Sequence, residues 1–120
     1  MGRGRIMTKE QFMRKYPEGT EFEVLGTTYT LYYDDSITAD HDANGLAELY
    51  SKKIIVSLHG YNDDEAFESI EDYYKKVLRH ELMHAFFHEM GLDNYCRDEI
   101  LVDSLALQLP KIKTLMKGFM

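Results

Sequence analysis

The segment His80-Glu81-Leu82-Met83-His84 contains the residues whose types and spacing best suit metal chemistry. Residues four apart share one face of a helix, so His80 and His84 could bind one metal ion together. Glu81 would then lie beside a metal-bound water and could accept its proton. The spacing therefore predicts a site for metal-assisted hydrolysis.

A third metal ligand is expected downstream, because a catalytic zinc takes three protein ligands and leaves its fourth position for water. Glu99 and Asp103 are four residues apart, hence on one helix face. One carboxylate could bind the metal while the other accepts the free N–H of a histidine ligand and fixes its orientation. We expect Glu99 to be the ligand, because its longer side chain stands at the start of the helix.

Two helices must position these side chains. Apolar residues recur at three- and four-residue steps over Asp64–Met90, with acidic residues early and basic residues late, which predicts one long helix capped by Asp63 or Asp64. The segment Gly91–Arg97 begins with a helix-ending glycine and is long enough to reverse the chain. A second apolar helix is expected over Asp98–Leu109, ending at Pro110.

The N-terminal half predicts a short helix and a small antiparallel sheet. Thr8–Tyr16 begins with a capping-box pattern. Alternating segments predict one hairpin from Glu21–Leu25 and Thr28–Tyr33, and a second from Gly45–Tyr50 and Lys53–Leu58. The expected fold class is α+β.

H-E-x-x-H followed by a helix with E-x-x-x-D resembles the gluzincin class of zinc metallopeptidases. The segment Val77–Ile112 is also similar to small zincin-like proteins of phages and prophages, and more distantly to the ImmA/IrrE type. The resemblance implies a minimal zincin-like fold, bound Zn²⁺ and hydrolysis of a protein or peptide substrate. The gap between His84 and Glu99 is shorter than in the larger peptidases, so the domain that connects the ligands there is missing.

The resemblance also implies roles for individual residues. It assigns Zn²⁺ to the two histidines and Glu99, proton transfer to Glu81, and orientation of a histidine to Asp103. The strand Lys53–His59 is expected at a sheet edge beside the metal, where an extended substrate would bind by strand addition. The candidates for stabilising the oxyanion of the transition state are Tyr95, Arg97, His59 and Tyr61.

Two other segments offer alternative metal ligands. His88 lies one turn beyond His84, which is too far along a straight helix to join His80 on one tetrahedral ion. Asp40–Gly45 reproduces the first half of an EF-hand calcium loop, but Ser51 stands where the bidentate glutamate belongs. An ordinary turn is the alternative for this segment.

Composition narrows the possible functions. A chain of 120 residues with net charge −7 predicts one domain, 1–120, and argues against a nucleic-acid-binding surface. No apolar stretch approaches the length of a membrane span, and residues 1–7 resemble a flexible extension without the apolar region of a signal peptide. The single cysteine, Cys96, suits a reducing cytoplasm.

A second function class is a zinc-stabilised, non-catalytic regulatory or interaction protein of a phage or mobile element. Structural zinc sites favour cysteine ligands and are coordinatively closed. A glutamate at position 81 therefore favours the metallopeptidase over this alternative.

Overall fold

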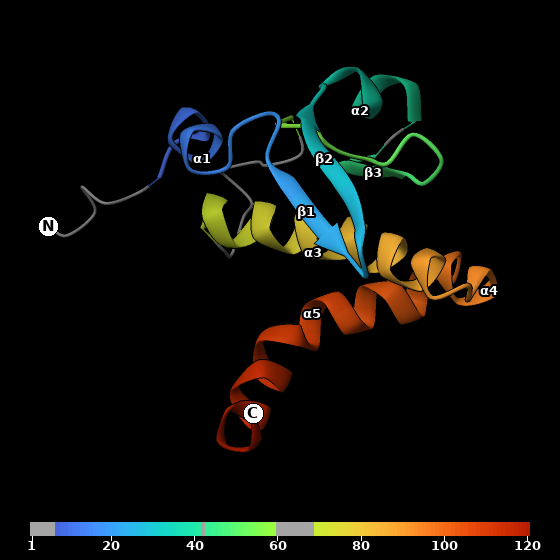
Figure 1. Cartoon of the computed structure of the whole chain (residues 1–120). Coiled ribbons are helices and arrows are strands. Elements are labelled where there is room, and N and C mark those ends of the chain that lie inside the picture. Colours follow the sequence, from blue (N-terminus) through green and yellow to red (C-terminus); the bar gives the residue numbers. More distant parts are fainter. Residues whose placement is uncertain (1–6, 42, 60–68) are drawn as a thin grey trace, which may run out of the picture.

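The computed structural model describes residues 7–41, 43–59 and 69–120. The chain is an α+β protein with a four-stranded sheet and a long C-terminal helix. Its helices are α1 (Lys9–Lys15), α2 (Ser36–His41), α3 (Ile70–Glu89), α4 (Asp93–Cys96) and α5 (Glu99–Met116), followed by a 3-10 turn (Lys117–Phe119). Its strands are β1 (Glu21–Val24), β2 (Thr27–Tyr33), β3 (Gly45–Glu48) and β4 (Lys53–Val56). Helix α3 lies between the sheet and α5 (Figure 1). Within the described ranges, no helix has the length and apolar character needed to cross a bilayer.

The sheet has the strand order β1-β2-β4-β3. Both predicted hairpins form, since β1 pairs antiparallel with β2 and β3 pairs antiparallel with β4. The expectation of a purely antiparallel sheet is wrong, because β2 and β4 run parallel, with Leu31 beside Ile54. Parallel neighbours need a crossover connection, and α2 and β3 lie in the connection from β2 to β4.

This strand order also corrects the expected position of the Lys53–His59 strand. Strand β4 lies between β2 and β3, so its backbone groups are paired on both sides. Strand β3 is the outer strand at this side of the sheet. An extended ligand could therefore be added to β3 but not to β4.

Helix α1 begins as predicted. The backbone N–H of Gln11 donates to Thr8 Oγ1 at 3.1 Å, and the Thr8 N–H donates to Gln11 Oε1 at 2.8 Å. Phe12, on the inner side of α1, is fully buried. Met7 packs against the same core, whereas the remainder of the predicted extension, residues 1–6, lies outside the described residues.

Helix α3 starts later than predicted. Ser69 is its N-cap, and the Ser69 side chain accepts the backbone N–H of Asp72. The predicted caps, Asp63 and Asp64, lie outside the described residues. Its C-terminal end follows the prediction: Gly91 has a φ of 77° and its N–H donates to the His88 carbonyl. The N–H of Leu92 donates to the carbonyl of Phe87, which completes a Schellman motif.

One face of α3 closes the main core against the sheet. Tyr74 and Ala85 are fully buried there, facing Leu31 and Ile54 of the central strands in one hydrophobic cluster. A second, smaller cluster joins another face of α3 to α4 and α5 through Phe87, Cys96 and Val102. Helix α3 is therefore held on two sides.

Helix α5 continues through Pro110 to Met116, so the prediction that it ends at the proline is wrong. Proline has no backbone N–H, which leaves the carbonyl of Ala106 without its usual helical donor. In this structure Arg79 of α3 supplies the donor, with its Nε 2.8 Å from the Ala106 oxygen. A side chain from the neighbouring helix thus compensates for the proline and also fixes α5 on α3.

The C-terminal end of α3 is tied to the sheet by Glu89. Its carboxylate accepts hydrogen bonds from Tyr29 Oη at 2.6 Å, from Lys52 Nζ at 2.9 Å and from Thr27 Oγ1 at 2.9 Å. These bonds, that of Tyr29 first, lower the pKa of Glu89 to about 2. The carboxylate stays ionised and joins the helix end to β2 and to the β3–β4 turn.

Substitution Arg79→Met removes the donor to the Ala106 carbonyl and keeps much of the apolar volume. We expect the free energy of unfolding to fall by about 1–3 kcal/mol, because a buried acceptor loses its partner. In a Pro110→Ala background the same substitution should lower the free energy of unfolding by less, since alanine restores the backbone N–H. Urea unfolding of the four proteins measures this coupling, and equal costs in the two backgrounds would contradict the interpretation.

Substitution Glu89→Gln should lower the free energy of unfolding by about 1–3 kcal/mol at neutral pH. The pKa of Glu89 is lowered in the folded protein from 4.5 to about 2, so its stabilising contribution is complete above pH 4.5 and is lost as the pH falls towards 2. The difference between parent and variant should therefore shrink across this interval in unfolding curves recorded at several pH values. A difference in the free energy of unfolding that does not change with pH would show that the negative charge of Glu89 does not contribute to stability.

Candidate metal centre

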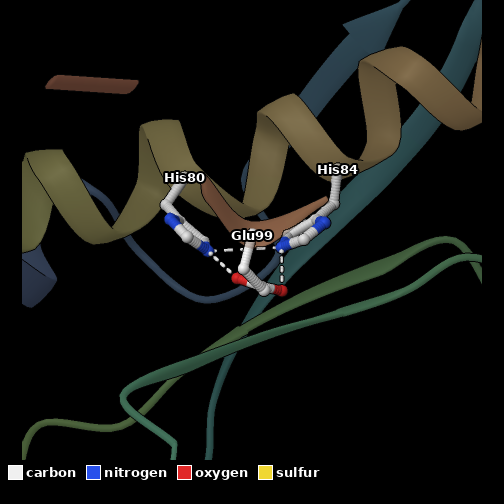
Figure 2. Close-up of side chains that lie close together, drawn as sticks. All are labelled: His80, His84 and Glu99. Atoms are coloured by element: carbon white, nitrogen blue, oxygen red, sulfur yellow. Dashed lines mark hydrogen bonds and ion pairs between the residues drawn. The ribbon is translucent and has the colours of Figure 1, made fainter. Parts of the chain in front are cut away.

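The side chains of His80, His84 and Glu99 converge beside α3 (Figure 2). The two histidine Nε2 atoms lie 3.2 Å apart. Glu99 Oε2 is 3.0 Å from His80 Nε2, and Glu99 Oε1 is 3.1 Å from His84 Nε2. Among the residues described, this is the only group of three or more His, Cys, Asp or Glu side chains arranged so that it could hold a metal ion.

Both histidines are oriented through their other ring nitrogen. The Nδ1–H of His84 donates to the backbone carbonyl of Cys96 at 2.5 Å, and that of His80 donates to Asp103 Oδ1 at 3.3 Å. Carbonyl and carboxylate oxygens can only accept, so each bond requires the proton on Nδ1. In the neutral rings the Nε2 lone pairs are then free to bind a metal.

The spacing of these atoms fits a tetrahedral zinc ion. Bonds of 2.0–2.1 Å at tetrahedral angles place neighbouring ligand atoms about 3.3 Å apart. The separation of 3.2 Å between the two Nε2 atoms is close to this value, and each Nε2 has a different oxygen of the Glu99 carboxylate at 3.0–3.1 Å. Glu99 is two-thirds exposed, whereas the side chains of His80 and His84 are only 20% and 13% exposed, so the group opens to solvent on the glutamate side.

Glu81 lies on a neighbouring face of α3 and is almost completely buried, with 7% of its surface exposed. Burial raises the pKa of its carboxyl to about 7, with a further increase from the charge of Glu99. The charge of His80 and a hydrogen bond from the backbone N–H of Ala47 oppose this shift. A carboxylate with a pKa near neutrality suits a general base.

Strand β3 approaches Glu81 closely because residue 45 is glycine. A Cβ atom at Gly45 would lie 2.8 Å from Val77 Cγ1 and 2.9 Å from Glu81 Oε2, which are both too close. The N–H of Ser57 donates to the carbonyl of Asn44, so the alternate residues Gly45 and Ala47 turn their backbone groups away from β4. The outer edge of β3, which pairs with no other described strand, therefore runs directly past the Glu81 carboxylate.

A cleft of about 720 Å³ contains the candidate metal group and is bounded by β3, α3 and the start of α5. Arg97 lines this cleft. Tyr95 and His59 do not; His59 Nε2 is instead 3.5 Å from Asp35 Oδ2. Tyr61 lies outside the described residues. Of the four candidate donors to the oxyanion, the described structure thus brings Arg97 to the cleft.

The alternative ligands lie elsewhere. The Nδ1 of His88 is 3.0 Å from Asp93 Oδ1, and His88 does not line the cleft. In the segment that resembles an EF-hand, Asp40 belongs to α2 and Gly45 begins β3, while Asp42 lies outside the described residues.

Two contributions to the site had no signal in the sequence pattern. The Cys96 carbonyl and the Ala47 N–H are backbone groups, so residue type does not reveal them.

Comparisons with family models, curated proteins and solved structures give no match to this chain.

We expect Glu99→Ala to abolish or strongly weaken Zn²⁺ binding, because it removes a direct ligand. Asp103→Asn should weaken it less, on the order of 10- to 100-fold, because it affects only the orientation of His80. Competition with a chromophoric chelator measures both affinities. Asp93→Asn is the matched control, since it alters the same kind of aspartate–histidine pair at His88 outside the cleft. Equal losses for the two aspartates would contradict the assignment.

Proposed function

We propose that this chain is a zinc-dependent peptide hydrolase with a minimal zincin-like fold. The observation that carries the proposal is the convergence of both histidine Nε2 atoms with the Glu99 carboxylate, beside the buried carboxylate of Glu81. Zn²⁺ bound there would lower the pKa of a water molecule in its fourth position and polarise the scissile carbonyl. The remaining steps fall to groups of the chain itself.

The substrate would bind as an extended strand along the open edge of β3. The outward-facing backbone groups of Gly45 and the carbonyl of Ala47 are suited to pairing with a peptide, and the Ala47 N–H already binds Glu81. The edge strand passes close to Glu81. A peptide paired there would thus run beside the general base and across the mouth of the metal-binding group.

Glu81 would act as the proton carrier. One carboxylate oxygen would accept a proton from the attacking water and then deliver it to the nitrogen of the leaving amine. The Ala47 N–H and the close backbone of Gly45 hold this side chain in one place, which limits its freedom before the reaction. Its burial keeps bulk water away from the proton that it transfers.

The open cleft favours catalysis over a purely structural zinc site. A structural site usually closes the metal with four protein ligands. Here the described residues offer three, and the third, Glu99, is largely exposed. This arrangement leaves space for water and for a substrate carbonyl.

Substitution Glu81→Gln should leave Zn²⁺ content and folding unchanged and abolish peptide hydrolysis, because an amide cannot accept the proton of water. Zinc analysis of untagged protein and a quenched fluorescent peptide library provide the measurements. His80→Ala is the matched control, which should lose both zinc and activity. A parent protein that binds zinc but cleaves no peptide would favour the non-catalytic alternative, and a Glu81→Gln variant as active as the parent would refute the proposed role.

A further inference from the structure

Arg97 differs from the other charged residues of the cleft in having no partner among the residues that the structure describes. Its guanidinium forms no hydrogen bond or ion pair with any residue in the described ranges, and the side chain is exposed. The three acidic residues of the cleft all have other contacts: Glu99 belongs to the candidate metal group, Asp103 accepts from His80, and Glu81 accepts from the Ala47 N–H. Within the described ranges, the cleft therefore offers a cation without a counter-ion.

The position of Arg97 in the chain places it near the reacting centre. The preceding residue, Cys96, binds His84 through its carbonyl, and Glu99 follows two residues later. The backbone therefore places Arg97 between Cys96, which orients His84, and the candidate ligand Glu99. Lys76 lies towards the other end of the cleft, one helical turn before His80.

The chemistry of the guanidinium points to a carboxylate ligand. Arginine presents a planar set of donors that matches a carboxylate in a bidentate geometry, and it stays charged at all relevant pH values. The chain as a whole has a net charge of −7, so an acidic substrate is not attracted by the overall charge. A local cation in the cleft would attract an acidic substrate to the site despite the negative charge of the whole chain.

Exposure argues against the alternative that Arg97 stabilises the oxyanion. Groups with that role act best when they are held in place and shielded from water. Arg97 is exposed and is not anchored by any described residue, so it lacks this organisation before substrate binds. An exposed, solvated guanidinium is better suited to a charged group on the substrate beside the scissile bond.

We propose that Arg97 binds a substrate carboxylate within one or two residues of the scissile bond, and so determines specificity. The carboxylate is either an aspartate or glutamate side chain or the C-terminal carboxylate of the peptide. This inference rests on the proposed peptide hydrolase. It defines the substrate class as peptides with a negative charge close to the cleavage point.

The test measures peptide binding without hydrolysis, using the zinc-loaded Glu81→Gln protein. The probes are short fluorescent peptides in which one glutamate is moved along a neutral sequence, each paired with its glutamine version, and each made with a free or amidated C-terminus. We expect at least one acidic peptide to bind about 10-fold more tightly than its neutral pair, with the preference lost in Arg97→Gln. The position of the preferred charge distinguishes a side chain from a C-terminus.

Two further variants serve as controls for this interpretation. Arg97→Glu should reverse the preference towards peptides with lysine at the same position. Lys113→Gln removes an exposed cation of α5 outside the cleft and should leave the preference unchanged. Zinc content and circular dichroism establish that each variant is folded.

The outcomes separate this inference from the proposed function. Equal binding of acidic and neutral peptides, or no binding of any peptide, overturns the role of Arg97 even if the parent hydrolyses peptides. An Arg97→Gln protein whose kcat falls equally for all peptides, with KM unchanged, would assign Arg97 to the oxyanion instead. A carboxylate preference that depends on Arg97 in a protein without hydrolytic activity would support Arg97 as the carboxylate-binding group and refute the peptide hydrolase.

Discussion

Helical periodicity in α3 is the constraint on which the site depends. Successive residues of a helix point about 100° apart, so His80 and Glu81 must face different neighbours. The histidine face meets α5, which brings Glu99 and Asp103, while the Glu81 face meets β3. A helix with a neighbour on only one of these faces would hold either the ligands or the base, but not both.

The contacts that hold α3 and its side chains against these two neighbours are mostly hydrogen bonds to backbone groups. The Cys96 carbonyl orients His84, the Ala47 N–H holds Glu81, and Arg79 donates to the Ala106 carbonyl. Each of these bonds fixes the distance between two elements as well as their orientation, which apolar packing alone does not do. The polar bonds therefore define the geometry of the site, and the two hydrophobic clusters supply the burial around it.

Much of the fold could be predicted because it follows from local pattern. The capping box at Thr8, the two hairpins and the glycine end of α3 are set by residues close together in the chain. The same is true of the face shared by His80 and His84 and of the face shared by Glu99 and Asp103. That these two faces meet was inferred from the short connection between the helices.

The features that were missed depend on partners distant in the chain. Alternation of side chains reveals a strand but not its neighbours, so the parallel pairing that makes β4 an inner strand had no signal. A proline usually ends a helix, but Arg79 of α3 supplies the donor that the Ala106 carbonyl lacks, and α5 continues beyond Pro110. The start of α3 is a third case: several residues between positions 63 and 69 can act as N-caps, and Ser69 is the one used.

The short chain distance between the ligands has a consequence for assembly. All three candidate metal ligands fall between residues 80 and 99, so closing the loop between His84 and Glu99 costs an unfolded chain little entropy. Zn²⁺ would consequently have appreciable affinity for the unfolded chain, and it would stabilise the native state by less than its native affinity indicates. The helical pair α3–α5 could close around the ion early in folding. Glu81 would become buried only when β3 docks against α3, so metal capture would precede completion of the reactive centre.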